Sequence, residues 1–226
     1  VCGYPPRDLL EFNDFIEESY KSVEIIKQHT NGIGVIIGAP QRNPKIEGKD
    51  LFNSALLIYN GLVIGTVNKS LLPTYDIFDE YRFFEPAKQW SVIEFKGQRV
   101  ALTICEDIWN LTDNPLYPTS PMELLIKQYP TILINITASP FDYDHDDDRK
   151  EIILANIKHY HLPILYCNTV GAQTEIVFDG GSLVFNNTGG LNKELKYFEE
   201  DFYVFDSSEL INQQTEPYHL IETRAS

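Results

Sequence analysis

A run of mostly apolar residues ends in a cysteine, and a polar turn follows it directly: Arg99-Val100-Ala101-Leu102-Thr103-Ile104-Cys105-Glu106-Asp107-Ile108-Trp109-Asn110. The apolar part predicts a buried strand. A thiol at the carboxyl end of such a strand, followed by a turn, occupies the place where α/β enzymes carry a nucleophile. A lone cysteine is more often a buried, inert side chain. A nucleophilic role for Cys105 therefore needs support from elsewhere in the chain.

That support comes from Lys69, in Val67-Asn68-Lys69-Ser70-Leu71-Leu72-Pro73. Lys69 follows the apolar run from Leu62 to Val67, a position where lysine is an unusual choice. A cationic side chain near a thiol lowers the thiol pKa and so favours the nucleophilic thiolate. The two segments together predict a cysteine–lysine site at the ends of two strands.

The rest of the chain predicts hairpins mixed with alternating helices and strands. Asn60-Gly61 between two apolar runs indicates one hairpin, and Lys96-Gly97-Gln98 indicates a second. Apolar residues at helical spacing predict a helix from Asp8 to about Ile26. We expect further helices near 121–128 and 147–161, and strands at 34–39, 131–136, 164–168, 175–178, 182–185 and 202–205. This pattern indicates an α/β protein with mixed sheets covered by helices.

Composition limits the class of protein. The 226 residues are 43% hydrophobic and 23% charged, as in one ordinary globular domain. The net charge of -15 argues against nucleic acid or an anionic membrane as a partner. Three widely spaced cysteines predict no disulfide framework and favour the cytoplasm as location. No Cys/His spacing predicts a metal site.

Four segments together resemble the nitrilase superfamily and, within it, the glutamine-hydrolysing domain of glutamine-dependent NAD synthetases. Two surround Cys105 and Lys69; the others are Gly3-Tyr4-Pro5-Pro6-Arg7-Asp8-Leu9-Leu10 and Val170-Gly171-Ala172-Gln173-Thr174-Glu175-Ile176-Val177-Phe178-Asp179-Gly180-Gly181-Ser182. The resemblance implies a four-layer α-β-β-α sandwich with two mixed sheets, formed by residues 1–211. It also implies that the first strand–helix–strand segment of that fold is missing. Residues 212–226 are then a polar tail, or the start of a linker to an absent ATP-dependent synthetase domain.

The resemblance implies a catalytic set of glutamate, lysine and cysteine. Cys105 and Lys69 match two members, whereas the family glutamate falls before Val1 and is not in the sequence. Glu80 matches a second family glutamate, which helps to position the lysine and the substrate. The implied reaction is attack of the thiol on the amide of L-glutamine, followed by hydrolysis of a glutamyl thioester. Lys69 and the backbone N–H of Glu106 would support the oxyanion.

The resemblance also implies five substrate contacts: Tyr4, Tyr75, Trp109, Ser139 and Arg149. Core packing is the alternative for the three aromatic residues. Ser139 lies in a stretch similar to the strand end Asn-x-Ser-x-Ser-Pro of the family. Arg149 is the nearest basic candidate for the glutamine carboxylate, because the Gly-Lys pair common in the family is replaced here by Asp144-His145.

The resemblance further implies partners and cofactors. The ammonia would supply the absent synthetase domain, which uses ATP and Mg, whereas the glutaminase half needs no cofactor. Homo-oligomers are usual in the family. Because the family glutamate is missing, we expect little or no activity from this chain, and Glu80 is a weak substitute since it enters from a different element. The alternatives are a non-catalytic remnant or scaffold, and a stand-alone nitrilase-type amidase or carbamoylase; the block Phe178–Ser182 argues against the latter.

Overall fold

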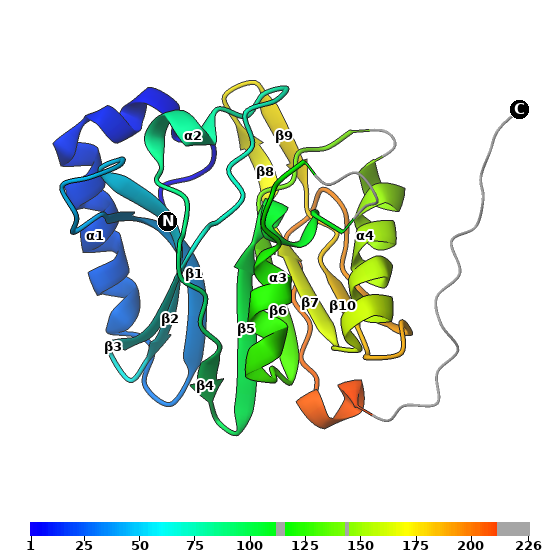
Figure 1. The fold of residues 1–226 in the computed structure, drawn as a ribbon. Coiled ribbons are helices and arrows are strands. Elements are labelled where there is room, and N and C mark those ends of the chain that lie inside the picture. The colour runs from blue at the N-terminus through cyan, green and yellow to red at the C-terminus, as the bar shows by residue number, and fades with distance from the viewer. Residues whose placement is uncertain (112–115, 143–144, 212–226) are drawn as a thin grey trace, which may run out of the picture.

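The computed structural model describes residues 1–111, 116–142 and 145–211, and they form a sandwich of four layers. In Figure 1, helix α1 (Asn13–Lys27) lies at the left, followed by a small sheet and a large sheet; helix α3 (Pro121–Leu125) lies in front of the large sheet and helix α4 (His145–Tyr160) at its right. This is the predicted α-β-β-α order. No helix in these described ranges is long and apolar enough to cross a membrane.

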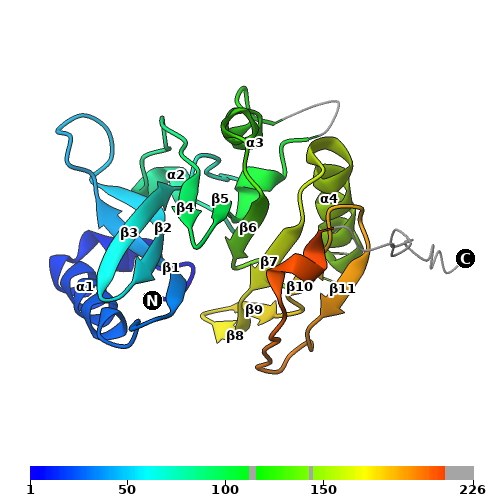
Figure 2. The same ribbon diagram turned by 90° about the horizontal axis from the view of Figure 1, so that it is seen from below.

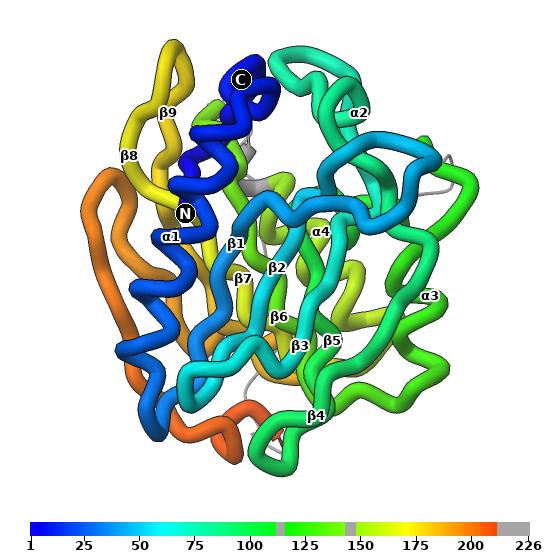
Figure 3. Tube along the Cα trace, turned by 90° about the vertical axis from the view of Figure 1, so that its left-hand side faces the viewer, coloured from blue at the N-terminus to red at the C-terminus, as the bar shows by residue number. Residues whose placement is uncertain are grey.

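The small sheet has three antiparallel strands in the order β1-β2-β3, namely Gly34–Arg42, Leu51–Tyr59 and Leu62–Asn68. Side chains alternate between its two faces, as the pleat of a strand requires. Leu56 and Ile58 pack with Val23 of α1, which runs beside β1 in Figure 3. Ala55 and Leu57 point the other way, into the core between the sheets. The small sheet is therefore apolar on both faces.

The large sheet has the strand order β11-β10-β7-β6-β5-β4. Its strands are β4 (Ile93–Phe95), β5 (Gln98–Ile104), β6 (Ile132–Thr137), β7 (Ile164–Asn168), β10 (Leu183–Phe185) and β11 (Leu191–Glu194). The central strands β5, β6 and β7 are parallel, whereas the outer pairs are antiparallel. One face packs on the small sheet, and α3 and α4 cover the other (Figure 2).

Short elements complete the structure: helix α2 (Glu80–Phe83), the hairpin β8–β9 (Val170–Gln173 and Ile176–Asp179), and 3-10 helices at Arg7–Glu11, Cys105–Ile108, Ile126–Gln128 and Ser207–Leu210. Because β5, β6 and β7 are parallel, their carboxyl ends meet at one edge of the large sheet. In open α/β sheets this edge is where ligands bind. Cys105 lies at this edge, directly after β5.

Both predicted hairpins, the helices predicted near 121–128 and 147–161, and most of the predicted strands are confirmed. The strand expected at 202–205 is wrong. The side chains of Phe202 and Val204 face solvent there, and the segment pairs with no strand of the described chain. The helix expected from Asp8 is broken at Phe12, whose extended backbone separates a 3-10 turn from α1. The structure also contains β8 and β11, which the sequence did not predict.

Candidate active site

Cys105 sits at a strained junction between β5 and a 3-10 turn. Its backbone φ is 45°, in the left-handed region that non-glycine residues rarely adopt. Such strain persists only where the surroundings impose it, and it is common at functional sites. One such restraint comes from β6, where the buried amide of Asn135 donates to the carbonyl oxygen of Cys105 at 3.2 Å. The junction has the geometry of a nucleophile turn.

Asp107 joins the Cys105 turn to the segment after Lys69. One carboxylate oxygen accepts the backbone N–H groups of Ser70 and Leu71, each at 2.9 Å, and the other accepts that of Ile104 at 3.2 Å. Burial raises the pKa of Asp107 to about 6, although these N–H groups and Lys69 act in the opposite direction. Asp107 therefore fixes the two predicted catalytic segments relative to each other.

Lys69 and Glu80 form a buried ion pair, with side chains only 1% and 4% exposed. The second oxygen of Glu80 accepts a hydrogen bond from the amide of Asn53 at 3.0 Å. Burial by itself would lower the pKa of Lys69, but the adjacent Glu80 carboxylate dominates together with other negative groups and raises it. Lys69 is therefore a permanent cation.

The thiol of Cys105 is not activated by Lys69 to the extent expected from the sequence. Burial raises the pKa of the Cys105 thiol, and the opposing effects of Lys69 and of a hydrogen bond with Thr137 do not compensate for it. Lys69 lowers the pKa of the thiol, as the sequence predicts, but burial has the larger effect. The raised pKa favours the neutral thiol of Cys105, so attack on an amide requires a base.

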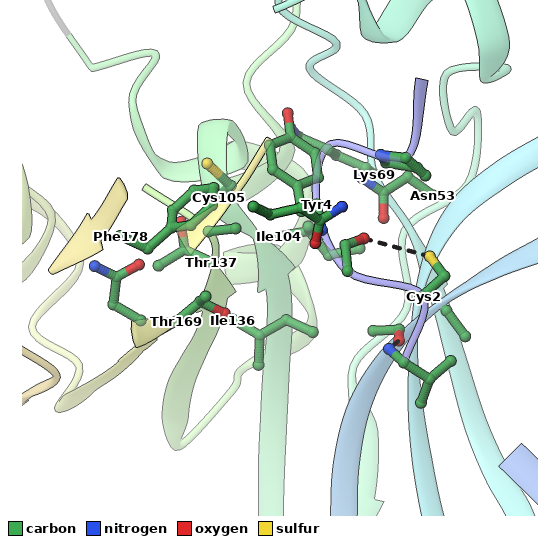
Figure 4. A pocket seen from close by; sticks show the side chains of 18 of the residues that line it. Cys2, Tyr4, Asn53, Lys69, Ile104, Cys105, Ile136, Thr137, Thr169 and Phe178 are labelled. Atoms are coloured by element: carbon green, nitrogen blue, oxygen red, sulfur yellow. Dashed lines mark hydrogen bonds between the residues drawn. The ribbon is translucent and has the colours of Figure 1, made fainter. Parts of the chain in front are cut away.

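A cavity of about 420 Å³ opens in front of this group of residues. Cys105, Lys69, Glu80, Asn53 and Tyr4 all line it, although they come from five separate segments. Figure 4 shows Tyr4, Lys69 and Asn53 beside one another, with Cys105 across the same cavity. The structure thus brings together all three catalytic residues predicted from the sequence, and Tyr4 of the predicted substrate contacts.

A second cavity of about 300 Å³ lies on the other side of Cys105 and is bordered by the side chain of Glu106. The Glu106 carboxylate accepts hydrogen bonds from Tyr75 at 2.9 Å and from Tyr117 at 3.3 Å. Burial raises the pKa of Glu106 despite these hydrogen bonds and Lys69. The sequence reasoning used only the backbone N–H of Glu106. The structure adds a buried carboxylate beside the thiol, which suits a cationic group of a ligand.

Trp109, Tyr75 and Ser139 line this second cavity, as expected for substrate contacts. Arg149 does not line either cavity. Its guanidinium is fully buried, binds Asp179 at 2.8 Å, and donates to the Ser139 hydroxyl at 3.1 Å and the Pro140 carbonyl at 2.9 Å. Arg149 instead holds the β6 end against β9, so its predicted contact with a substrate carboxylate is not supported.

Sequence reasoning missed Asn53, Asp107 and Tyr117 as parts of this site. Asn53 lies inside β2 at an otherwise apolar stretch, which is a weak signal for a buried polar contact. Asp107 follows the cysteine by two residues but gives no sign of its three backbone partners. Tyr117 lies in an irregular segment without periodicity. In the described part of the chain, no group of three His, Cys, Asp or Glu side chains is arranged to hold a metal ion.

Comparisons with known proteins agree with this architecture. Glutamine-dependent NAD(+) synthetase from Synechocystis sp. is 32% identical over 99% of this chain, and that from Thermotoga maritima is 34% identical over 90%. The chain spans 42% and 34% of the length of these two relatives. The structure of glutamine-dependent NAD+ synthetase from Acinetobacter baumannii matches 96% of this chain and 40% of that one, with a TM-score of 0.80 and 28% identity.

An amidase from Nesterenkonia sp. matches the fold over 86% of this chain and 69% of its own, with a TM-score of 0.69 and 21% identity. The four-layer sandwich is therefore the fold that these amidase and NAD+ synthetase structures share. More specifically, the family model for carbon-nitrogen hydrolase matches residues 27–208, and the chain belongs to that family.

Proposed function

We propose that this chain is a cysteine-dependent amide hydrolase domain that releases ammonia from L-glutamine. The observation that carries the proposal is the Cys105 thiol, which stands on a strained backbone and shares a cavity with the buried Lys69–Glu80 pair. Once a base has taken the thiol proton, the Cys105 sulfur can attack a carbonyl group, and the nearby Lys69 cation stabilises the oxyanion that forms.

The proposed reaction has two halves. In the first, Cys105 Sγ forms a bond to the amide carbon, the thiol proton passes to a base, and ammonia leaves with that proton to give a glutamyl thioester. In the second, water attacks the thioester carbon and releases glutamate and the free thiol. Lys69 and the backbone N–H of Glu106 would stabilise the negative oxygen in both tetrahedral intermediates.

The described residues do not supply an obvious base for the Cys105 proton. Glu80 is bound by Lys69 and Asn53, and Glu106 by two tyrosines, so neither carboxylate of the described chain is free for the Cys105 proton. We propose that the base is the glutamate that the nitrilase resemblance implies upstream of Val1. The cavity of about 420 Å³ leaves room for it beside the thiol, and Val1 lies on the wall of that cavity.

Glu106 supports L-glutamine over a neutral amide. Its carboxylate lies next to the nucleophile, is buried, and borders the second cavity with Tyr75, Trp109 and Ser139. A buried carboxylate is stabilised by a cationic partner. The α-ammonium group of glutamine is such a partner, whereas a simple aliphatic amide carries none.

The relatives' names support a destination for the ammonia. A glutamine-dependent NAD(+) synthetase couples a glutamine site to NAD formation, and the chain matches less than half of two such proteins. We propose that a synthetase domain in a longer protein uses the ammonia, with ATP and Mg bound there and no cofactor in the hydrolase domain.

The test is ammonia release from L-glutamine by the purified chain, with Cys105→Ala as control. We expect slow release that the control abolishes, because loss of a general base typically costs about 10²–10⁴ in rate. Release that persists in Cys105→Ala would reject Cys105 as the nucleophile. A panel of other amides distinguishes the alternative, since preference for an uncharged amide would indicate a stand-alone amidase.

A further inference from the structure

The N-terminal segment and the hairpin β8–β9 hold each other in a clasp, which consists of Gly3, Tyr4, Pro5 and Gln173. The backbone N–H of Tyr4 donates to Gln173 Oε1 at 3.1 Å, and Gln173 Nε2 donates to the carbonyl oxygen of Pro5 at 3.4 Å. One side-chain amide thus satisfies a donor and an acceptor of a segment almost 170 residues away. In Figure 3 the N-terminal end of the chain lies beside this hairpin.

Gly3 shows how closely the clasp fits. A Cβ atom placed on Gly3 would lie only 2.0 Å from Gln173 Oε1, and φ at Gly3 is +74°. The Gln173 amide therefore occupies the space that any other side chain at position 3 would fill. An ion pair between Arg7 and Glu175 at 2.6 Å joins the same two segments at the surface.

The clasp leads directly to the catalytic pair through Tyr4. The Tyr4 side chain lines the 420 Å³ cavity together with Cys105, Lys69 and Glu80, and burial together with the nearby Glu80 carboxylate raises the pKa of the Tyr4 hydroxyl. Glu80 thus has three neighbours: its ion-pair partner Lys69, its hydrogen-bond donor Asn53, and the side chain of Tyr4 in the same cavity. Tyr4 is the only one of the three that belongs to neither β2 nor the loop after β3. Its position depends on what holds the N-terminal segment.

We propose that Gln173 is a positioning residue, which holds the Tyr4 ring over the Lys69–Glu80 pair and so keeps water away from the Cys105 thiol. This inference rests on the proposed function, in which Cys105 is the nucleophile. Gln173 does not touch the reacting atoms and acts through the backbone of Tyr4. This role of Gln173 also explains why two sequence blocks far apart in the chain, around Tyr4 and around Gln173, contribute to one site.

The test measures how the rate of Cys105 alkylation by iodoacetamide depends on pH, with peptide mass spectrometry separating Cys105 from Cys2 and Cys167. The Gln173→Ala variant releases Tyr4 and admits water. Because burial is the largest cause of the raised Cys105 pKa, the midpoint of the profile should move to lower pH, by about 0.5 units or more. Gln98→Ala is the matched control, since Gln98 also makes two amide hydrogen bonds but lies at the far end of β5.

A second background separates positioning from a purely structural role. In a Tyr4→Ala chain there is no ring to position, so adding Gln173→Ala should cause no further shift of the midpoint. Gly3→Ala is an independent route to the same state, because its Cβ displaces the Gln173 amide while Gln173 itself remains. We expect Gly3→Ala to shift the midpoint in the same direction as Gln173→Ala. It also provides the test if Gln173→Ala does not fold.

Two results would overturn the proposal: a Gln173→Ala or Gly3→Ala profile that coincides with that of Gln98→Ala, or a shift that adds in full to that of Tyr4→Ala. Alkylation requires no turnover. Failure of the clasp is therefore distinguishable from failure of the proposed hydrolase activity, which is measured separately by ammonia release and its loss in Cys105→Ala.

Discussion

At the residue scale, the site depends on a few buried charges that compensate one another. Lys69 lies in the interior with Glu80 as its partner, and Asn53 donates a further hydrogen bond to that carboxylate. A buried ion pair contributes little net stability, but removal of one member leaves an uncompensated charge. The energetics of Lys69 and Glu80 therefore belong to the pair.

The variant Lys69→Met should lower the free energy of unfolding by about 3–5 kcal/mol, because it leaves the Glu80 carboxylate buried without its cation. Urea denaturation followed by circular dichroism measures this change. The double variant Lys69→Met/Glu80→Leu should recover much of the loss. Lys21→Met, which removes an exposed lysine paired with Glu18, serves as control and should leave the midpoint unchanged. If Lys69→Met and Lys21→Met lowered the free energy of unfolding equally, Lys69 and Glu80 would not be a buried, compensated pair.

Asp107 makes the stability depend on pH. Burial raises its pKa from 3.8 to about 6, so the folded state holds a proton that the unfolded state has already lost. The stability that Asp107 gains by binding this proton is fully present below about pH 3.8 and is lost as the pH rises through 6. Relative to Asp107→Asn, the chain should therefore lose on the order of 1 kcal/mol of stability between pH 5.2 and 7.5. Urea denaturation of both proteins at the two pH values measures the difference. A gap between them that stays constant with pH would refute the raised pKa.

At the element scale, turns set the register that delivers the site residues. Asn60 and Gly61 have φ values of 49° and 77°, which a two-residue turn between twisted strands requires. The Asn60 side chain accepts the backbone N–H of Gly32 at 2.7 Å, and the backbone N–H of Gly61 donates to Thr30 Oγ1 at 2.9 Å. The turn fixes the first pairs of β2 with β3, an irregularity between Leu57 and Ile58 shifts the register beyond them, and β3 ends one residue before Lys69.

The variant Gly61→Val should destabilise the chain by about 1–2 kcal/mol, because a β-branched residue is strained at positive φ. Gly38→Ala is the matched control. Gly38 does not have a positive φ, and the nearest atom to an added Cβ there is 3.7 Å away. Thermal unfolding of both variants gives the comparison. Equal melting temperatures would mean that the conformation of the turn does not limit stability.

The same scale shows what the sequence can predict. The hairpin at Asn60-Gly61 and the strand before Cys105 carry local signals, namely turn residues and apolar runs, and both are confirmed. Residues 202–205 form a similar apolar run, yet Phe202 and Val204 face solvent. An apolar run does not reveal whether a partner strand exists. The strand β11 (Leu191–Glu194) was missed because its polar residues are typical of an exposed edge.

At the scale of the whole molecule, the site is assembled from segments far apart in the chain. Cys105 and Lys69 could be identified because each ends an apolar run, and Tyr4, Tyr75, Trp109 and Ser139 through a family resemblance. The pairing of Asp107 with Ser70 and Leu71, and the burial of Arg149 against Asp179, depend on tertiary packing. A sequence contains no local signal for such contacts. This is why Arg149 was taken for a substrate contact.

The central claim also belongs to the scale of the whole molecule: the cavities around Cys105 bind glutamine and present it to the thiol. The measurement that tests this most directly is covalent labelling by a glutamine analogue that carries a chloroketone in place of the amide, followed by peptide mass spectrometry. It reports on binding and on the nucleophile without requiring turnover. We predict a single label on Cys105 that excess L-glutamine prevents. Labelling of Cys2 or Cys167 at the same rate, or labelling of Cys105 that L-glutamine does not slow, would contradict the account.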